Sequence, residues 1–247
     1  MPRGFTLHDL PPTPRAAFDR GQDPVVSLVN IATVPLGIDL GKLAVVLQEY
    51  VNKHLGPVWD LPPVKVQAAA AAREIPVGTW GLRFADDADQ PGVLGYHELT
   101  PQNLPISNVF VRTIVGGQES IPVTASHELA EMLIDPAINL WAEKSDGVLW
   151  AYESSDAVED TAFVIDGVPL SNFQYPSWFE KTRKPKSTRF DHLAKCTRPF
   201  QLLRGGYSLV LQSGRISQVF GSLAKEKRFA REDRAGHRSE VRKVSAA

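Results

Sequence analysis

The chain contains the stretch Thr124-Ala-Ser-His-Glu-Leu-Ala-Glu-Met-Leu-Ile-Asp-Pro136. Its apolar residues recur with the period of a helix, and it carries one histidine and two glutamates that could bind a metal ion or transfer protons. At about 100° per residue, His127, Glu128 and Glu131 fall within roughly one 100° arc of a helix, and apolar side chains lie opposite them. The proline that closes the stretch cannot continue a helix, because it has no backbone N–H. We therefore expect a short helix over 124–134 that carries the motif His-Glu-x-x-Glu.

The spacing within this helix suits a metal ion. His127 and Glu131 are four residues apart, so an imidazole and a carboxylate can reach the same point and share one divalent cation. Glu128 lies to one side of the line joining them, where a carboxylate can activate a water molecule on a metal. The competing interpretation is a short amphipathic helix whose histidine and two glutamates form a solvated face.

An acidic segment downstream, Tyr152-Glu-Ser-Ser-Asp-Ala-Val-Glu-Asp160, could supply a third ligand. Glu153 and Asp156 lie 22 and 25 residues beyond Glu131, and either could complete a site with three protein ligands. Acidic segments are usually solvated, but neighbouring aromatic residues predict partial burial here, and buried carboxylates need partners. His97, on a predicted strand upstream, is an alternative third ligand.

The rest of the chain predicts an α+β domain with a mixed sheet. A long helix is expected over 39–55, with Asp39 as its N-cap and Gly56-Pro57 as its stop. The segments 80–84 and 93–99 are expected to pair as a hairpin. The other expected strands cover 25–31, 64–68, 108–115, 148–152, 161–165 and 205–211.

Composition narrows the class of protein. Of the 247 residues, 43% are apolar and 22% charged, with 27 basic against 28 acidic side chains. A net charge so close to zero argues against a domain whose overall charge attracts nucleic acid or an anionic membrane. The single cysteine, Cys196, can form neither an internal disulfide nor a multi-thiolate zinc site. With no apolar run near the ~18 residues of a membrane span and no apolar leader, we expect a cytoplasmic protein.

Three regions are expected along the chain. Residues 1–24 are rich in proline and predict an extended arm, followed by one domain over 25–221. Residues 222–247 hold eight basic and four acidic side chains with few apolar ones, which predicts a mobile tail. This basic tail is a candidate for contact with an acidic partner.

The ordered motifs also resemble a known family. His-Glu-Leu-Ala-Glu, then Asp-Pro, a tryptophan and a Glu-x-x-Asp segment are similar to the HExxE group of zincin-like metallopeptidases. The pattern resembles plant EXORDIUM-like (phosphate-induced) proteins and related bacterial hypothetical proteins over roughly residues 108–160. The resemblance implies a zincin-like fold, one zinc ion per chain and a peptide or protein substrate. It assigns His127 and Glu131 as ligands, Glu128 as the base, and Glu153 or Asp156 as the completing ligand.

The chain also departs from that family. Where the common HExxH motif has a second histidine, this chain has Glu131, a harder ligand that could weaken zinc binding or admit another metal. The secreted relatives carry a signal peptide, which we do not expect here, and more cysteines than the single one of this chain. A non-catalytic metal-binding protein, structural or partner-binding, is therefore the alternative to a zinc metallopeptidase.

Overall fold

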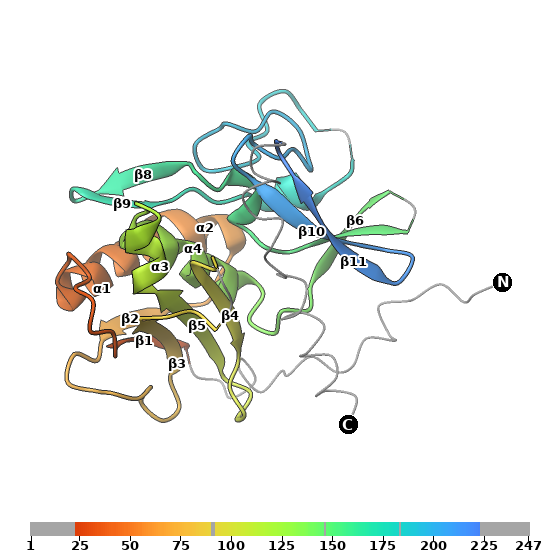
Figure 1. The fold of residues 1–247 in the computed structure, drawn as a ribbon. Helices are drawn as coiled ribbons and strands as arrows, with labels where there is room; N and C mark the ends of the chain where they lie inside the picture. Colours follow the sequence, from red (N-terminus) through yellow and green to blue (C-terminus); the bar gives the residue numbers. More distant parts are fainter. Residues whose placement is uncertain (1–22, 90–91, 146, 183, 223–247) are drawn as a thin grey trace.

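The computed structural model describes residues 23–89, 92–145, 147–182 and 184–222. The expected N-terminal arm and basic tail lie outside the described residues, apart from positions 23, 24 and 222. Within the described part, the chain forms several sheets and few helices, which confirms a mixed α+β architecture (Figure 1).

The largest sheet has five strands in the order β2-β1-β3-β5-β4. β1, β2, β3 and β5 run parallel, and β4 is antiparallel to β5, so the sheet is mixed as expected. The expected hairpin between 80–84 and 93–99 is wrong, because β4 pairs with β5 and β3 lies between β1 and β5. The strands are β1 (Val25–Asn30), β2 (Lys65–Ala68), β3 (Trp80–Ala85), β4 (Gly95–Leu99) and β5 (Pro105–Phe110).

The expected long helix forms but does not stop at Gly56-Pro57. It comprises α1 (Leu40–Glu49), the π-helix η3 (Tyr50–Leu55) and α2 (Gly56–Trp59). As expected, the Asp39 side chain accepts a hydrogen bond from the Lys42 amide at the start. The Gly56 N–H bonds to the Val51 carbonyl, and Pro57 follows as the second residue of α2.

The expected strand over 108–115 is correct only in its first part. β5 ends at Phe110, and the chain then forms α3 (Val111–Gly116). Val111 and Ile114, three residues apart, are fully buried on one side of this helix, while Val115 is 52% exposed. Tertiary burial at helical spacing therefore overrides the local preference of β-branched residues for a strand.

The motif helix, α4 (Ile121–Ile134), begins three residues earlier than expected. Pro122 occupies its first turn, a position that proline tolerates. The helix ends before Asp135, whose carboxylate accepts hydrogen bonds from the Asn139 and Leu140 amides at 3.0 Å. α4 packs on β4 and β5 and also contacts η3. α4 and the long helix that contains η3 therefore cover the same face of the five-stranded sheet (Figure 1).

A second, antiparallel sheet has the order β11-β10-β7-β6. Its strands are β6 (Trp141–Ser145), β7 (Val148–Ala151), β10 (Tyr207–Gln212) and β11 (Arg215–Phe220). The sequence predicted β7 and β10 but neither β6 nor β11. A hairpin of β8 (Ala162–Ile165) and β9 (Val168–Ser171) turns at Asp166-Gly167, and β9 contacts α4. Two short 3₁₀ helices follow β7 and β9: η4 (Asp156–Val158) and η5 (Pro176–Phe179).

The described residues contain two hydrophobic clusters. The larger one lies between the five-stranded sheet and its helices, and the smaller one surrounds Trp150 and Trp178 of the second sheet and η5. Trp59 and Tyr152 pack against both clusters. The longest described helix has 14 residues, and none within the described part has both the length and the apolar character of a membrane span.

Candidate metal centre

The fold brings all the candidate residues of the sequence to the region between α4, β4 and the segment that follows β7. They are His97 on β4, three residues of α4 (His127, Glu128 and Glu131), Glu153 after β7, and Asp156 at the start of η4. Their side chains do not form a solvated face. Glu128 and Glu131 are 5% and 4% exposed, so the interpretation of α4 as a helix with a wet polar face is wrong.

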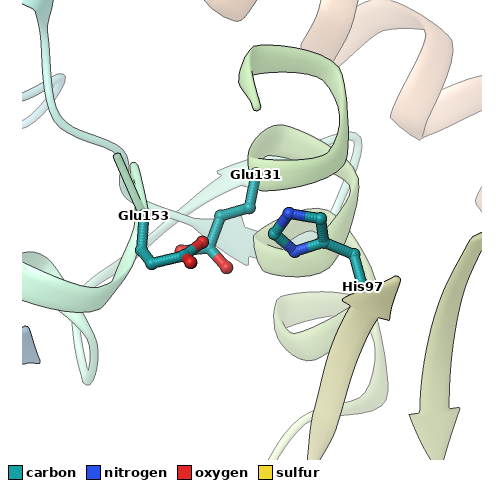
Figure 2. A group of neighbouring side chains, drawn as sticks. All are labelled: His97, Glu131 and Glu153. Carbon is teal, nitrogen blue, oxygen red and sulfur yellow. The ribbon is translucent and has the colours of Figure 1, made fainter. Parts of the chain in front are cut away.

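The first potential metal-binding group combines His97, Glu131 and Glu153. One ligand atom from each lies within 4.8 Å of the others, and all three residues are buried. Figure 2 shows the three side chains pointing toward one another from β4, α4 and the segment after β7. Imidazole nitrogen and carboxylate oxygen are donors that zinc and other first-row divalent ions accept. This group could therefore hold one divalent ion.

A second potential group lies on α4 itself and shares Glu131 with the first. It comprises His127, Glu128 and Glu131. The Nε2 atom of His127 lies 3.3 Å from Oε1 of Glu131 and 3.2 Å from Oδ1 of Asp156. The helical spacing thus brings His127 and Glu131 together as the sequence predicted, and Asp156 joins them from η4.

His97 is oriented by the end of α4. Its Nε2 atom lies 3.2 Å from the backbone carbonyl of Asp135. A carbonyl can only accept, so the neutral ring carries its proton on Nε2 and keeps its lone pair on Nδ1. Metal-binding histidines commonly donate their other ring N–H to such an acceptor. This contact supports His97 as a metal ligand, although no neighbouring residue in the sequence indicated that role.

The segment that carries Glu153 and Asp156 is fixed by backbone hydrogen bonds. The Ser155 amide donates to Oε1 of Glu131 at 3.1 Å. The Gln174 amide donates to the Ser154 carbonyl at 2.6 Å, and the Gln174 side chain accepts from the Ala157 amide at 3.3 Å. Gln174 was missed in the sequence, because its contact with a segment some twenty residues away leaves no local signal.

Two glycines, also missed, allow the close approach of the elements around the site. A Cβ atom on Gly95 would lie 2.8 Å from both Oε1 of Glu128 and the Asn108 carbonyl. A Cβ atom on Gly206 would lie 2.2 Å from the Ala157 carbonyl, next to Asp156. Contacts this short do not occur for real side chains, so the space beside Glu128 and Asp156 requires glycine.

Burial and mutual repulsion shift the acid–base properties of the carboxylates. Desolvation is the main reason why the pKa of Glu128 is well above its usual range and that of Glu131 is about 8. Desolvation likewise raises the pKa of Asp156. Burial alone would lower the pKa of His127, but Glu131 and Asp156 outweigh it and raise the pKa overall.

Repulsion between the buried carboxylates adds to this desolvation and raises their pKa values further. Four carboxylates meet two imidazoles in a largely buried space, and Oε2 of Glu128 has no hydrogen-bond partner among the described residues. A buried carboxylate oxygen without a partner is energetically costly. A divalent cation would relieve both the repulsion and the missing interaction, so the residues present fit such an ion.

Comparison of the chain with known family models, with curated proteins and with solved structures finds no match.

Proposed function

We propose that this protein is a metal-dependent hydrolase, with a peptide bond as the substrate and zinc as the metal. The observation that carries the proposal is the state of Glu128. Glu128 is 5% exposed, one of its carboxylate oxygens has no hydrogen-bond partner among the described residues, and it belongs to one potential metal-binding group that shares Glu131 with the other. The similarity of the motif to HExxE zincin-like peptidases supports the same function.

Glu131 is the central metal-binding residue of this proposal, because it belongs to both groups. His97 and Glu153 approach it in one group, and His127 in the other, with Asp156 in contact with His127. An ion held here would act as a Lewis acid that polarises a carbonyl group and lowers the pKa of a nearby water. The hydrogen bond from the Ser155 amide keeps the Glu131 carboxylate in its orientation.

Glu128 is the general base of the proposed reaction. It takes a proton from the attacking water and gives it to the departing amine of the peptide. A general base works best when its pKa lies near the working pH, and burial raises the pKa of Glu128 in that direction. Because Gly95 has no side chain, the Glu128 carboxylate can lie against the start of β4.

The second candidate function is a non-catalytic metal-binding protein, and burial is the observation that favours it. His97, Glu131 and Glu153 are 5%, 4% and 8% exposed, and closed sites are typical of structural metal ions. In such a protein the metal would stabilise the fold. Glu128 would then have no role in chemistry.

Digestion of a diverse peptide library separates the two candidates. The zinc-loaded protein should cleave members of the library, and chelation should stop the cleavage. Glu128→Gln preserves shape but removes the basic oxygen, so its rate should fall by about 10²–10⁴ while metal content persists. Equal cleavage by parent and variant would exclude Glu128 as the base. No cleavage by the metal-loaded parent would favour the non-catalytic candidate.

A further inference from the structure

His127, Glu131 and Asp156 converge as the ligands of a single ion do. The Nε2 atom of His127 lies 3.3 Å from Oε1 of Glu131 and 3.2 Å from Oδ1 of Asp156. Ligand atoms about 2.0–2.1 Å from a tetrahedral zinc ion lie roughly 3.3 Å from one another, so both distances match an edge of such a coordination shell. Oδ1 of Asp156 is buried and has no hydrogen-bond partner among the described residues. These three residues form a first ion position that does not need Glu128.

His97 and Glu153 offer a second, separate set of donors to Glu131. Figure 2 shows the two side chains approaching the Glu131 carboxylate from β4 and from the segment after β7. One ligand atom from each of the three residues lies within 4.8 Å of the others, and all three are buried. The contact of His97 Nε2 with the Asp135 carbonyl leaves the ring a lone pair on Nδ1. The second position thus takes only Glu131 from the first.

Glu131 can serve both positions because a carboxylate has two oxygens. Oε1 is the atom that lies near His127. In two-metal sites the ions are typically about 3.5–4 Å apart, a separation that one carboxylate can bridge. A single ion held by His97, Glu131 and Glu153 would leave Oδ1 of Asp156 without a partner, which is costly for a buried carboxylate oxygen. Occupation of both positions removes that cost.

We propose that this centre holds two divalent ions at the same time, one with His127 and Asp156 and one with His97 and Glu153, bridged by Glu131. The proposal rests on the hydrolase function for its meaning in catalysis, since a pair of ions stabilises both the attacking and the leaving atom of a displacement. The binding itself does not require turnover. The two ions repel each other, so one is kept when free metal is removed and the second is bound only in equilibrium with free metal.

The test uses the full-length protein with zinc and, separately, with manganese. Equilibrium dialysis against increasing zinc counts the bound ions while free metal is present. Electron paramagnetic resonance of the manganese-loaded protein reports whether two bound ions are close enough for their electron spins to couple. We expect about two zinc ions per chain at saturation, and a spin-coupled manganese signal that appears only when the second ion binds.

Variants at each position make the test specific. His97→Ala and Asp156→Asn should each lose one of the two ions and the spin coupling, and each should keep the other ion. Glu153→Gln is a smaller change at the second position and replaces His97→Ala if that variant does not fold. Asp166→Asn is the matched control, because it removes one carboxylate from an exposed hairpin turn. It should bind two coupled ions.

Saturation below two ions, or two ions without spin coupling, would overturn the proposal. So would two coupled ions in the folded variants of either position. These failures differ from failure of the hydrolase function. Metal-dependent cleavage by a protein that saturates at one ion removes the second ion and keeps the enzyme. Two coupled ions without any cleavage remove the enzyme and keep the two-ion centre.

Discussion

Position 95 shows how a single residue type shapes the site. β4 approaches α4 so closely at Gly95 that the carboxylate of Glu128 occupies the space of a missing side chain. The Asn108 carbonyl, a backbone atom that cannot rotate away, lies equally close on the other side. Glycine here is therefore a requirement of packing, and the position of Glu128 depends on it.

Gly95→Ala should displace Glu128 and destabilise the fold by about 1–3 kcal/mol, as overpacking of a tight contact does. Gly116→Ala is the matched control, because a Cβ atom there meets no atom within 4 Å. The control should change the unfolding free energy by less than about 1 kcal/mol, in the stabilising direction. Chemical denaturation of both variants provides the comparison. Equal stability of the two variants would show that β4 and α4 can separate freely at position 95.

The sequence predicted the site residues that lie close to one another along the chain. His127, Glu128 and Glu131 share one helix, so their spacing alone places them on one arc. Glu153 and Asp156 were found because aromatic neighbours indicated burial, and Asp156 is in fact 2% exposed. Gly95 and Gln174 act through contacts between distant segments, and a single sequence contains no trace of those contacts.

At the scale of elements, the segment after β7 is the part of the site that lies outside the α-helices and β-strands. It has a short 3₁₀ helix, η4, and depends on Gln174 for two of its hydrogen bonds. Gln174 is itself held by Trp59, whose indole N–H donates to the Gln174 carbonyl at 3.0 Å. Trp59 belongs to α2, the turn of helix that continues past Gly56-Pro57.

Gln174→Ala should loosen this segment, because it removes the side-chain acceptor of the Ala157 amide. Residues that orient ligands typically change metal affinity by about 10- to 100-fold, and we expect a loss in that range. Gln212→Ala, on an exposed position of β10, should leave affinity unchanged. Zinc affinity is measured by competition with a chelating dye. Wild-type affinity in Gln174→Ala would mean that the segment does not contribute to the metal site.

The elements that the sequence predicted incorrectly share a cause. The β-branched run at 108–115 favours a strand locally, and Gly56-Pro57 is usually a helix stop, yet both segments are helical in part. Burial of Val111 and Ile114 decides the outcome in the first segment, and in the second the partly buried Val58 and Trp59 pack against the larger cluster. β6 and β11 were missed because each becomes recognisable as a strand only beside its partner.

At the scale of the whole molecule, the site lies where the two hydrophobic clusters come together. Tyr152, which packs against both clusters, immediately precedes Glu153, and its ring stacks on Phe179 with centroids 4.2 Å apart. The buried carboxylates therefore lie within the folding core, and their charge state affects the stability of the entire described fold.

The metal-free protein should lose stability as pH rises. The raised pKa values of Glu128, Glu131, Asp156 and His127 mean that the folded state holds more protons than the unfolded state between about pH 4 and 8. Stability is then greatest below the unfolded pKa values and declines as pH approaches the Glu131 pKa of about 8. Denaturant midpoints of chelator-treated protein across this range test the prediction.

Two comparisons make the pH experiment specific. Glu131→Gln removes one of the titrating groups, so its stability should fall less steeply with pH. Zinc should stabilise the parent more at the alkaline end, because its ligands must lose their protons to bind. Parallel pH profiles of parent and variant would contradict this account of the buried charge.

The most direct test of the account is the metal content of the purified protein. Elemental analysis of protein prepared without chelator and supplied with zinc should find about one ion per chain in the parent and in Asp166→Asn. Glu131→Gln, which alters the residue common to both groups, should remain folded and contain none. Loss of the ion in His97→Ala would assign it to the group of His97, Glu131 and Glu153, and loss in His127→Ala to the group of His127, Glu128 and Glu131. A folded parent that binds no divalent metal, or full metal content in Glu131→Gln, would contradict the central claim.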